Sequence, residues 1–101
     1  MLYAFMLEDD PARSDIRQRL RQAHVAYLQA VAEQIAFAGP FTDDDGQAMS
    51  GSLLVIEFPS RAVAQEWMAG EPYNRAGLYA SSTIQTFVNR WPQKAGFPSA
   101  H

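Results

Sequence analysis

The chain of 101 residues contains no cysteine. This absence excludes disulfide bonds, thiolate metal sites and a cysteine nucleophile, and it is compatible with a reducing cytoplasm, where we expect the protein. The chain also lacks the length for a second hydrophobic core, so we expect one domain over residues 1–92. Residues 93–101 are predicted to be a C-terminal tail, and His101 is discounted because we interpret part of this tail as a cloning remnant.

Positive charge is also scarce in this chain. Its 8 lysines and arginines are outnumbered by 11 acidic residues, which gives a formal net charge of −3. A phosphate backbone would be repelled by this balance, so we predict that nucleic acid is not a partner. Four arginines lie close together, but acidic residues lie beside them, and we interpret the cluster as a solvated, mixed-charge helix face. These arginines are Arg13, Arg17, Arg19 and Arg21.

Long hydrophobic runs are absent as well. The apolar N-terminus, residues 1–7, meets the acidic residues Glu8, Asp9 and Asp10 directly. A membrane-spanning helix needs about 20 apolar residues. A signal peptide would need a basic region and a small-residue cleavage site, neither of which is found here. We therefore predict no association with a membrane.

Several motifs that carry chemistry are missing. The sequence has no glycine-rich phosphate loop, no histidine pair at metal-binding spacing and no serine in a nucleophile elbow. Asp43, Asp44 and Asp45 are consecutive, whereas a calcium loop needs alternating ligands and a distant glutamate. We interpret these aspartates as a solvated loop and predict neither a metal nor a cofactor.

Apolar residues make up 48% of the chain, as in an ordinary folded protein. Their spacing predicts the order β, α, β, β, α, β, which is typical of the α+β ferredoxin-like fold, a four-stranded antiparallel sheet with two helices on one face. The predicted strands cover residues 2–7, 37–41, 51–58 and 82–91, and the predicted helices cover 13–36 and 61–69. The other sheet face is left bare and apolar, so we expect a homodimer packed sheet on sheet.

His24 is a polar residue on the apolar face of the first predicted helix. At 100° per residue it falls in the same arc as Leu20, Tyr27 and Leu28. An unpaired buried polar group costs about 1–3 kcal/mol, so its ring nitrogens need partners. Two interpretations remain open here: a satisfied core histidine, and a catalytic or ligand-binding group that titrates near neutral pH.

Glu71 is the best candidate partner for His24. It lies between Gly70 and Pro72, where the proline holds the backbone extended. A carboxylate that accepts from one imidazole nitrogen leaves the other free as a base. A surface glutamate is the alternative interpretation. Tyrosines such as Tyr27 and Tyr73 belong more often to a core or an interface than to a ligand platform.

Five short motifs, in this order, resemble those of the YciI-like (YCII-related) family. The resemblance covers nearly the whole chain, and the motifs are weak singly but fairly specific together. They are His24-Val-Ala-Tyr27-Leu28, Ala38-Gly39-Pro40, Gly51-Ser52, Glu71-Pro72-Tyr73 and Ala76-Gly77-Leu78-Tyr79.

The resemblance implies a ferredoxin-like monomer that forms a dimeric α/β barrel, with a histidine and an acidic residue in a pocket near the dimer interface. The family's helix histidine falls on His24, and its Asp-Pro-Tyr motif falls on Glu71-Pro72-Tyr73. Glutamate for aspartate keeps the charge but adds a methylene, which moves the carboxylate by about 1.5 Å. From the matched motifs we take Tyr73, Ser52 and Tyr27 as candidate substrate-binding residues.

Two functions are compatible with these features. The first is a small cofactor-independent lyase or isomerase in which His24 transfers a proton on a small organic substrate and Glu71 orients it. A related dehydrochlorinase shows that the resembled scaffold hosts such chemistry. The second is a non-catalytic module that holds a small molecule in the dimer pocket or meets a partner protein.

Overall fold

A computed structural model describes residues 1–92, so the predicted tail at 93–101 lies outside the described residues. Four antiparallel strands form one sheet in the order β2-β3-β1-β4. The strands are β1 (Leu2–Asp9), β2 (Ile35–Thr42), β3 (Met49–Glu57) and β4 (Tyr79–Phe87). The helices are α1 (Asp15–Arg19), α2 (Arg21–Gln29), α3 (Arg61–Ala69) and α4 (Pro72–Ala76), with 3-10 turns at Pro11–Arg13 and Ala32–Gln34.

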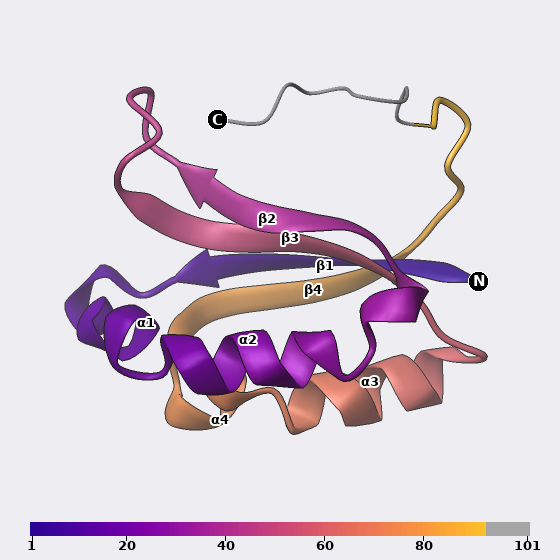
Figure 1. Cartoon of the computed structure of the whole chain (residues 1–101), viewed down its shortest axis with the longest axis horizontal. Helices are drawn as coiled ribbons and strands as arrows, with labels where there is room; N and C mark the ends of the chain where they lie inside the picture. The colour runs from indigo at the N-terminus through magenta and orange to yellow at the C-terminus, as the bar shows by residue number, and fades with distance from the viewer. Residues whose placement is uncertain (93–101) are drawn as a thin grey trace.

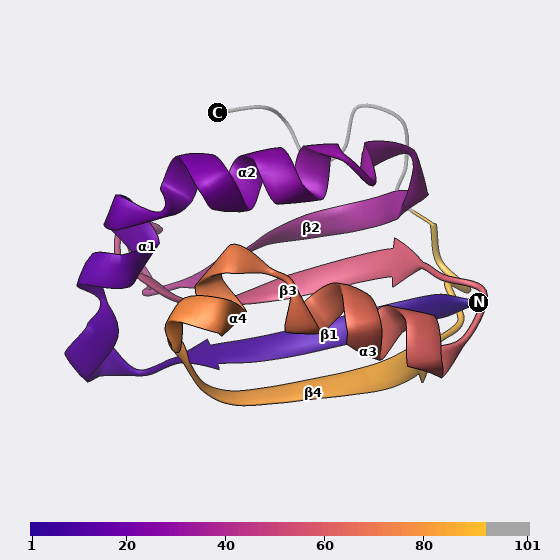
Figure 2. The ribbon, with the colours of Figure 1, turned by 90° about the horizontal axis from the view of Figure 1, so that it is seen from below.

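The four helices of residues 1–92 all lie on one face of the sheet, and no helix of that part of the chain lies on the other face (Figure 1). Seen from below, α2 runs along the β2 side while α3 and α4 cover the middle (Figure 2). This arrangement confirms the predicted ferredoxin-like α+β fold. Within residues 1–92, no helix combines the length and the apolar character that crossing a bilayer requires.

The core lies between the central strands and the helices. Successive side chains of a strand point to opposite faces, so Phe5 and Leu7 of β1 face the helices together with Leu54 and Ile56 of β3. Each of these four is at most 2% exposed. Phe5 pairs with Leu54 across the two strands. Burial of such side chains contributes about 1.5–3 kcal/mol each, which fixes the register of the central strands.

The first helical region is shorter and more broken than the predicted helix over 13–36. Leu20, at φ −107° and ψ 16°, ends α1 and begins α2. Its carbonyl accepts the His24 N–H at 3.0 Å, so the chain resumes as a helix at once. The helix ends at Gln29, and Ile35 belongs to β2, where it pairs with Ile56. Val31 and Ile35 fit a helical spacing, but short apolar patterns do not separate helix from strand.

The last strand lies earlier than the predicted residues 82–91. It runs from Tyr79 to Phe87 because its partner, β1, begins at Leu2, which pairs with Phe87. Residues 88–92 have no strand to pair with, and Trp91 is 93% exposed. A proline cannot donate to a central ladder, so Pro40 predicts an edge strand, and β2 does lie at the edge of the sheet, with β3 inside it.

Two glycines provide a test of how closely the strands approach. A Cβ added to Gly51 would lie 2.2 Å from the carbonyl oxygen of Leu7, whereas one at Gly39 would meet nothing within 4 Å. We expect Gly51→Ala to lower the free energy of unfolding by about 1–3 kcal/mol, as overpacking does. Gly39→Ala should leave it unchanged or raise it slightly. Urea unfolding measures both, and equal stability of the two variants would contradict the described register.

Candidate functional site

A buried carboxylate bonded to a histidine forms the centre of the candidate site. Glu71 is 0% exposed, and its Oε1 is hydrogen-bonded to Nδ1 of His24. Its Oε2 accepts the backbone N–H of Asn74 at 2.7 Å. The Tyr79 hydroxyl also points at Oε1, at a longer 3.5 Å. The glutamate therefore reaches His24 with the side chain that is one methylene longer than the aspartate of the resembled motif.

Local sequence explains why Glu71 occupies this position. Its backbone is extended, at φ −66° and ψ 129°, as expected before Pro72. Pro72 starts α4, since proline suits the first helical position, and Glu71 is the N-cap. Gly77 ends the same helix at φ +83°, a left-handed conformation that glycine adopts readily. The short helix thus returns the chain to β4 within a few residues of the carboxylate.

The second nitrogen of the His24 ring remains available. With a carboxylate acceptor at Nδ1, the neutral form of the imidazole carries its proton on that nitrogen and has its lone pair on Nε2. No residue in the described range 1–92 bonds to Nε2, and within that range no unpartnered polar side-chain atom is fully buried. The imidazole stacks on the Tyr73 ring at 4.1 Å between centroids and 12° between planes. Tyr73 and Glu71 together fix the orientation of the imidazole.

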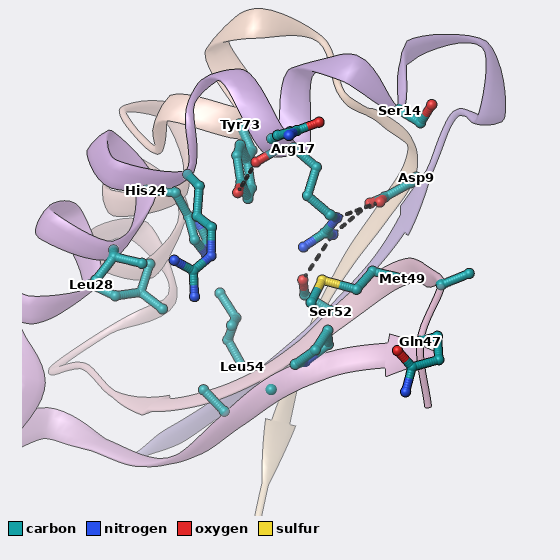
Figure 3. Close-up of a pocket in the computed structure, with 17 residues that line it drawn as sticks. Asp9, Ser14, Arg17, His24, Leu28, Gln47, Met49, Ser52, Leu54 and Tyr73 are labelled. Atoms are coloured by element: carbon teal, nitrogen blue, oxygen red, sulfur yellow. Dashed lines mark hydrogen bonds and ion pairs between the residues drawn. The ribbon is translucent and has the colours of Figure 1, made fainter. Parts of the chain in front are cut away.

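His24 lines a cavity of about 630 Å³ between the α1–α2 region and strands β2 and β3 (Figure 3). This volume suits a small organic molecule. Tyr73 and Ser52, two of the candidate binding residues, line the same cavity, and Glu71 lies behind His24. Tyr27 does not line it, because its hydroxyl donates to the carbonyl of Trp67 at 2.8 Å and its ring packs on that indole.

Sequence reasoning missed Arg17 and Asp9 at the other end of the cavity. Arg17 donates to both carboxylate oxygens of Asp9, at 2.8 and 2.9 Å, and to Ser52 Oγ at 3.2 Å. Its side chain is 14% exposed, so the interpretation of a solvated face is wrong for this arginine. It is right for Arg19, which is 62% exposed. Spacing in the sequence could have indicated Arg17 as a site residue, because it precedes His24 by seven residues, which is about two turns of the predicted helix.

Tyr73 separates the imidazole of His24 from the guanidinium of Arg17. Figure 3 shows its ring between His24 and Arg17, and the guanidinium carbon lies 5.2 Å from the ring centroid. Its hydroxyl donates to the carbonyl of Arg17 at 2.6 Å. One buried tyrosine, 1% exposed, therefore positions both the imidazole and the guanidinium.

The surroundings of Arg17, Tyr73 and Tyr79 keep each of these side chains in one charge state. Burial opposes the charged form of Arg17, but the hydrogen bonds and the charge of Asp9 outweigh it and raise the pKa of Arg17. Burial, reinforced by the Glu71 carboxylate, raises the pKa of the Tyr79 phenol above its usual value, and burial does the same for Tyr73. Arg17 is therefore a permanent cation and both phenols are neutral donors. Residues 1–92 bring together no group of three His, Cys, Asp or Glu side chains suited to a metal ion.

Comparison with known proteins places these residues in context. Residues 1–88 match the family model of the YCII-related domain. Protein YciI from Escherichia coli O6:H1 is 33% identical over 94 residues, covering 86% of this chain and 96% of that protein. An uncharacterized protein from Haemophilus influenzae is 28% identical over the same shares of each chain.

A solved structure with a similar fold also matches. It is the 5-chloro-2-hydroxyhydroquinone dehydrochlorinase TftG from Burkholderia phenoliruptrix AC1100, in complex with 2,5-dihydroxybenzoquinone. The TM-score is 0.81 at 28% identity, and the match covers 87% of this chain and 94% of that chain. The likeness therefore extends over most of both chains.

The raised phenol pKa of Tyr79 predicts how stability depends on pH. Tyrosines in the unfolded chain ionise near pH 10, whereas the folded Tyr79 stays protonated. The contribution of the buried Tyr79 phenol to the free energy of unfolding is therefore fully present below about pH 10, and it is lost as the pH rises above that value. We expect Tyr79→Phe to reduce the loss of unfolding free energy between about pH 9 and 11. Urea unfolding at several pH values measures this, and parallel losses in both proteins would refute it.

Proposed function

The chain belongs to the YCII-related domain family, and from the geometry of its His24–Glu71 pair we propose that it is a small cofactor-independent lyase or isomerase. The observation that carries the proposal is a fixed imidazole whose free Nε2 faces a cavity of small-molecule size. A buried acceptor that sets the tautomer and orientation of a histidine is the usual arrangement behind a general base. His24 is the catalytic residue and Glu71 is the positioning residue.

The proposed reaction begins with proton abstraction. Nε2 of His24 takes a proton from a carbon next to a carbonyl, and the C–H electron pair becomes an enolate. In an isomerase the imidazolium returns that proton to a different carbon. In a lyase the enolate expels a leaving anion from the neighbouring carbon, and the proton passes to solvent. The Glu71 carboxylate stabilises the imidazolium between these steps.

The comparison with TftG supports a small oxygenated ring as substrate. TftG is a dehydrochlorinase that was solved with 2,5-dihydroxybenzoquinone, and it shares the fold of this chain at a TM-score of 0.81. Tyr73 and Ser52, which line the cavity beside His24, are the proposed substrate contacts. Which ring compound is the substrate depends on the cavity's other residues, since a fold hosts many reactions.

The proposal includes a homodimer that covers the bare sheet face. Met6 of β1 is 45% exposed and Phe41 of β2 is 40% exposed, and together with Thr83 they line a second hollow of about 530 Å³. Exposed apolar groups over a helix-free sheet face are typical of an interface. A second copy packed on this face would remove them from water, which stabilises both subunits.

The central prediction concerns His24. We expect His24→Gln to reduce turnover of 5-chloro-2-hydroxyhydroquinone, or exchange of the ring protons of 2,5-dihydroxybenzoquinone with D2O, by about 100-fold or more, as loss of a general base does. The glutamine amide can still donate to Glu71, so the buried carboxylate keeps a partner. Chloride release and proton NMR measure the two reactions, and circular dichroism verifies the fold.

Glu71→Gln and Tyr27→Phe complete this test. The single amide oxygen of a glutamine cannot accept hydrogen bonds from both His24 and Asn74. Glu71→Gln should therefore slow turnover by a smaller factor than His24→Gln does, and it should also lower the free energy of unfolding. Tyr27→Phe is the matched control, because its hydroxyl bonds to Trp67 outside the cavity. Unchanged activity in His24→Gln would overturn the proposed function. Binding of these probes without any turnover by the unaltered chain would instead support the non-catalytic module.

The dimer is tested by placing a charge on the bare face. We expect Met6→Lys to convert a dimer into a monomer in analytical ultracentrifugation, since burying an unpaired ammonium in an apolar interface is strongly unfavourable. Val63→Lys is a matched control, because Val63 is equally an exposed apolar residue, at 40%, but lies on α3. A monomeric unaltered chain would contradict this part of the proposal.

A further inference from the structure

The cavity carries a charge opposite to that of the chain. Of its lining residues Asp9 is the one acid, whereas Arg17 and Arg21 are both cations, so the lining described has one positive charge in excess. The whole chain has a formal net charge of −3. A low-dielectric cavity concentrates the field of such charges on whatever enters it. Because the buried Glu71 carboxylate lies behind His24, this positive charge favours an anion at the Arg17 end of the cavity.

The guanidinium of Arg17 has N–H groups that are not used in hydrogen bonds to residues 1–92. Its Nε and Nη2 are occupied by Asp9 and Ser52, but no residue within 1–92 accepts from its Nη1. A guanidinium presents five N–H donors in a rigid fork, so holding one side with Asp9 orients the other. The Tyr73 ring, at 5.2 Å, restricts the remaining freedom. Arg17 is thus a preorganised cation with unused N–H groups at the polar end of the cavity.

Ser52 adds a second donor beside Arg17. Ser52 is 3% exposed, and its hydroxyl oxygen accepts a hydrogen bond from Arg17 Nη2 at 3.2 Å. An oxygen that accepts through a lone pair keeps its own O–H proton to donate. No acceptor for that proton is found among residues 1–92. Arg17 and Ser52 together therefore form a site that is complementary to an oxyanion.

Arg21 lies between Arg17 and His24 in the chain. It begins α2, three residues before His24, which is a neighbouring position on one face of that helix. It lines the cavity, and within the described part of the chain it forms no ion pair, in contrast to Arg17 and Arg19. Its guanidinium therefore has no ion-pair partner among residues 1–92, and its positive charge opposes that of the Glu71 carboxylate behind His24.

Apolar side chains line the opposite end of the cavity beside His24 and Arg21. Figure 3 shows Leu28 and Leu54 on the His24 side, away from Arg17 and Asp9. Val25 and Ala38 also line the cavity. Apolar walls favour a hydrocarbon or ring body, and a few placed polar groups fix its orientation. The cavity is therefore polarised between an oxyanion site and an apolar wall.

We propose that the cavity selects a small organic anion, a ring or short carbon skeleton whose ionised oxygen binds Arg17 Nη1 and the Ser52 hydroxyl while its body packs against Leu28 and Leu54. This inference names the substrate class of the proposed function and rests on it for the role of His24. The cationic groups also stabilise the negative charge that an enolate develops after proton abstraction. Arg17 and Arg21 are the specificity-determining residues.

Matched ligands test the charge preference. Benzoate and benzamide have the same planar shape and differ in charge, and 2,5-dihydroxybenzoquinone replaces the carboxylate by an ionised hydroxyl. We expect at least one of the two anions to bind about tenfold or more tightly than benzamide, the size of effect that a charged hydrogen bond gives. Titration calorimetry gives the Kd, and amide NMR shifts verify that the ligand lies beside His24 and Ser52.

Three variants assign the preference to residues. Arg17→Gln combined with Asp9→Asn removes the donors without leaving a buried carboxylate unpaired, and Arg21→Gln removes the unpaired charge. Each should weaken binding of the anion by about fivefold or more, as the loss of a charged hydrogen bond does. Arg19→Gln is the control on the same helical region, because Arg19 is exposed and outside the cavity, and it should change Kd by less than about twofold.

The outcomes separate this inference from the proposed function. Benzamide binding as tightly as both anions, no binding of either anion, or equal Kd values in the Arg17, Arg21 and Arg19 variants would each overturn the inference. Selective anion binding without any His24-dependent turnover would leave the inference standing and overturn the enzymatic function. His24-dependent turnover with no dependence on Arg17 or Arg21 would do the reverse.

Discussion

The carboxylate of Glu71 is completely buried, and the arrangement of the whole site depends on satisfying it. Removing a carboxylate from water costs several kcal/mol, so it must be offset by donors aimed at both oxygens. Those donors are the backbone N–H of Asn74 and the ring of His24, with the Tyr79 hydroxyl farther away. One partner comes from α4, one from α2 and one from β4. The same charge therefore caps a helix, orients an imidazole and ties three elements together.

An ion pair between Asp9 and Arg17 lies at the other end of the cavity. Asp9, at the end of β1, holds Arg17 in a bidentate pair, and Arg17 in turn reaches Ser52 on β3. Tyr73 lies between this pair and the His24–Glu71 pair and contacts both sides. One aromatic ring thus separates a base on α2 from a cation on α1. The separation allows one small molecule to meet a proton acceptor and an oxyanion site at once.

Much of the fold could be predicted because local patterns and topology agree. The apolar runs at residues 2–7 and 51–58 predicted β1 and β3, and Pro40 predicted the edge strand β2. Ser60 caps α3 by accepting from the backbone N–H of Val63. Boundaries were harder. Ile35 matched a helical spacing and yet pairs with Ile56, because a strand neighbour supplies backbone partners that a single sequence does not reveal. The end of β4 was set by the start of β1, which is also a property of pairing.

The sequence by itself determined which groups were unusual: a histidine on an apolar stripe, and a glutamate held extended before a proline. It also determined the family, since the motifs around His24 and Glu71-Pro72-Tyr73 follow one another along the chain in the order that the resembled family has. Only the tertiary structure decided that Glu71 reaches His24, that Tyr27 turns away to Trp67, and that Arg17 lies in a cavity instead of in solvent. Each of these depends on contacts between residues far apart in the chain, and charge or spacing along one segment carries no information about the segment that packs against it.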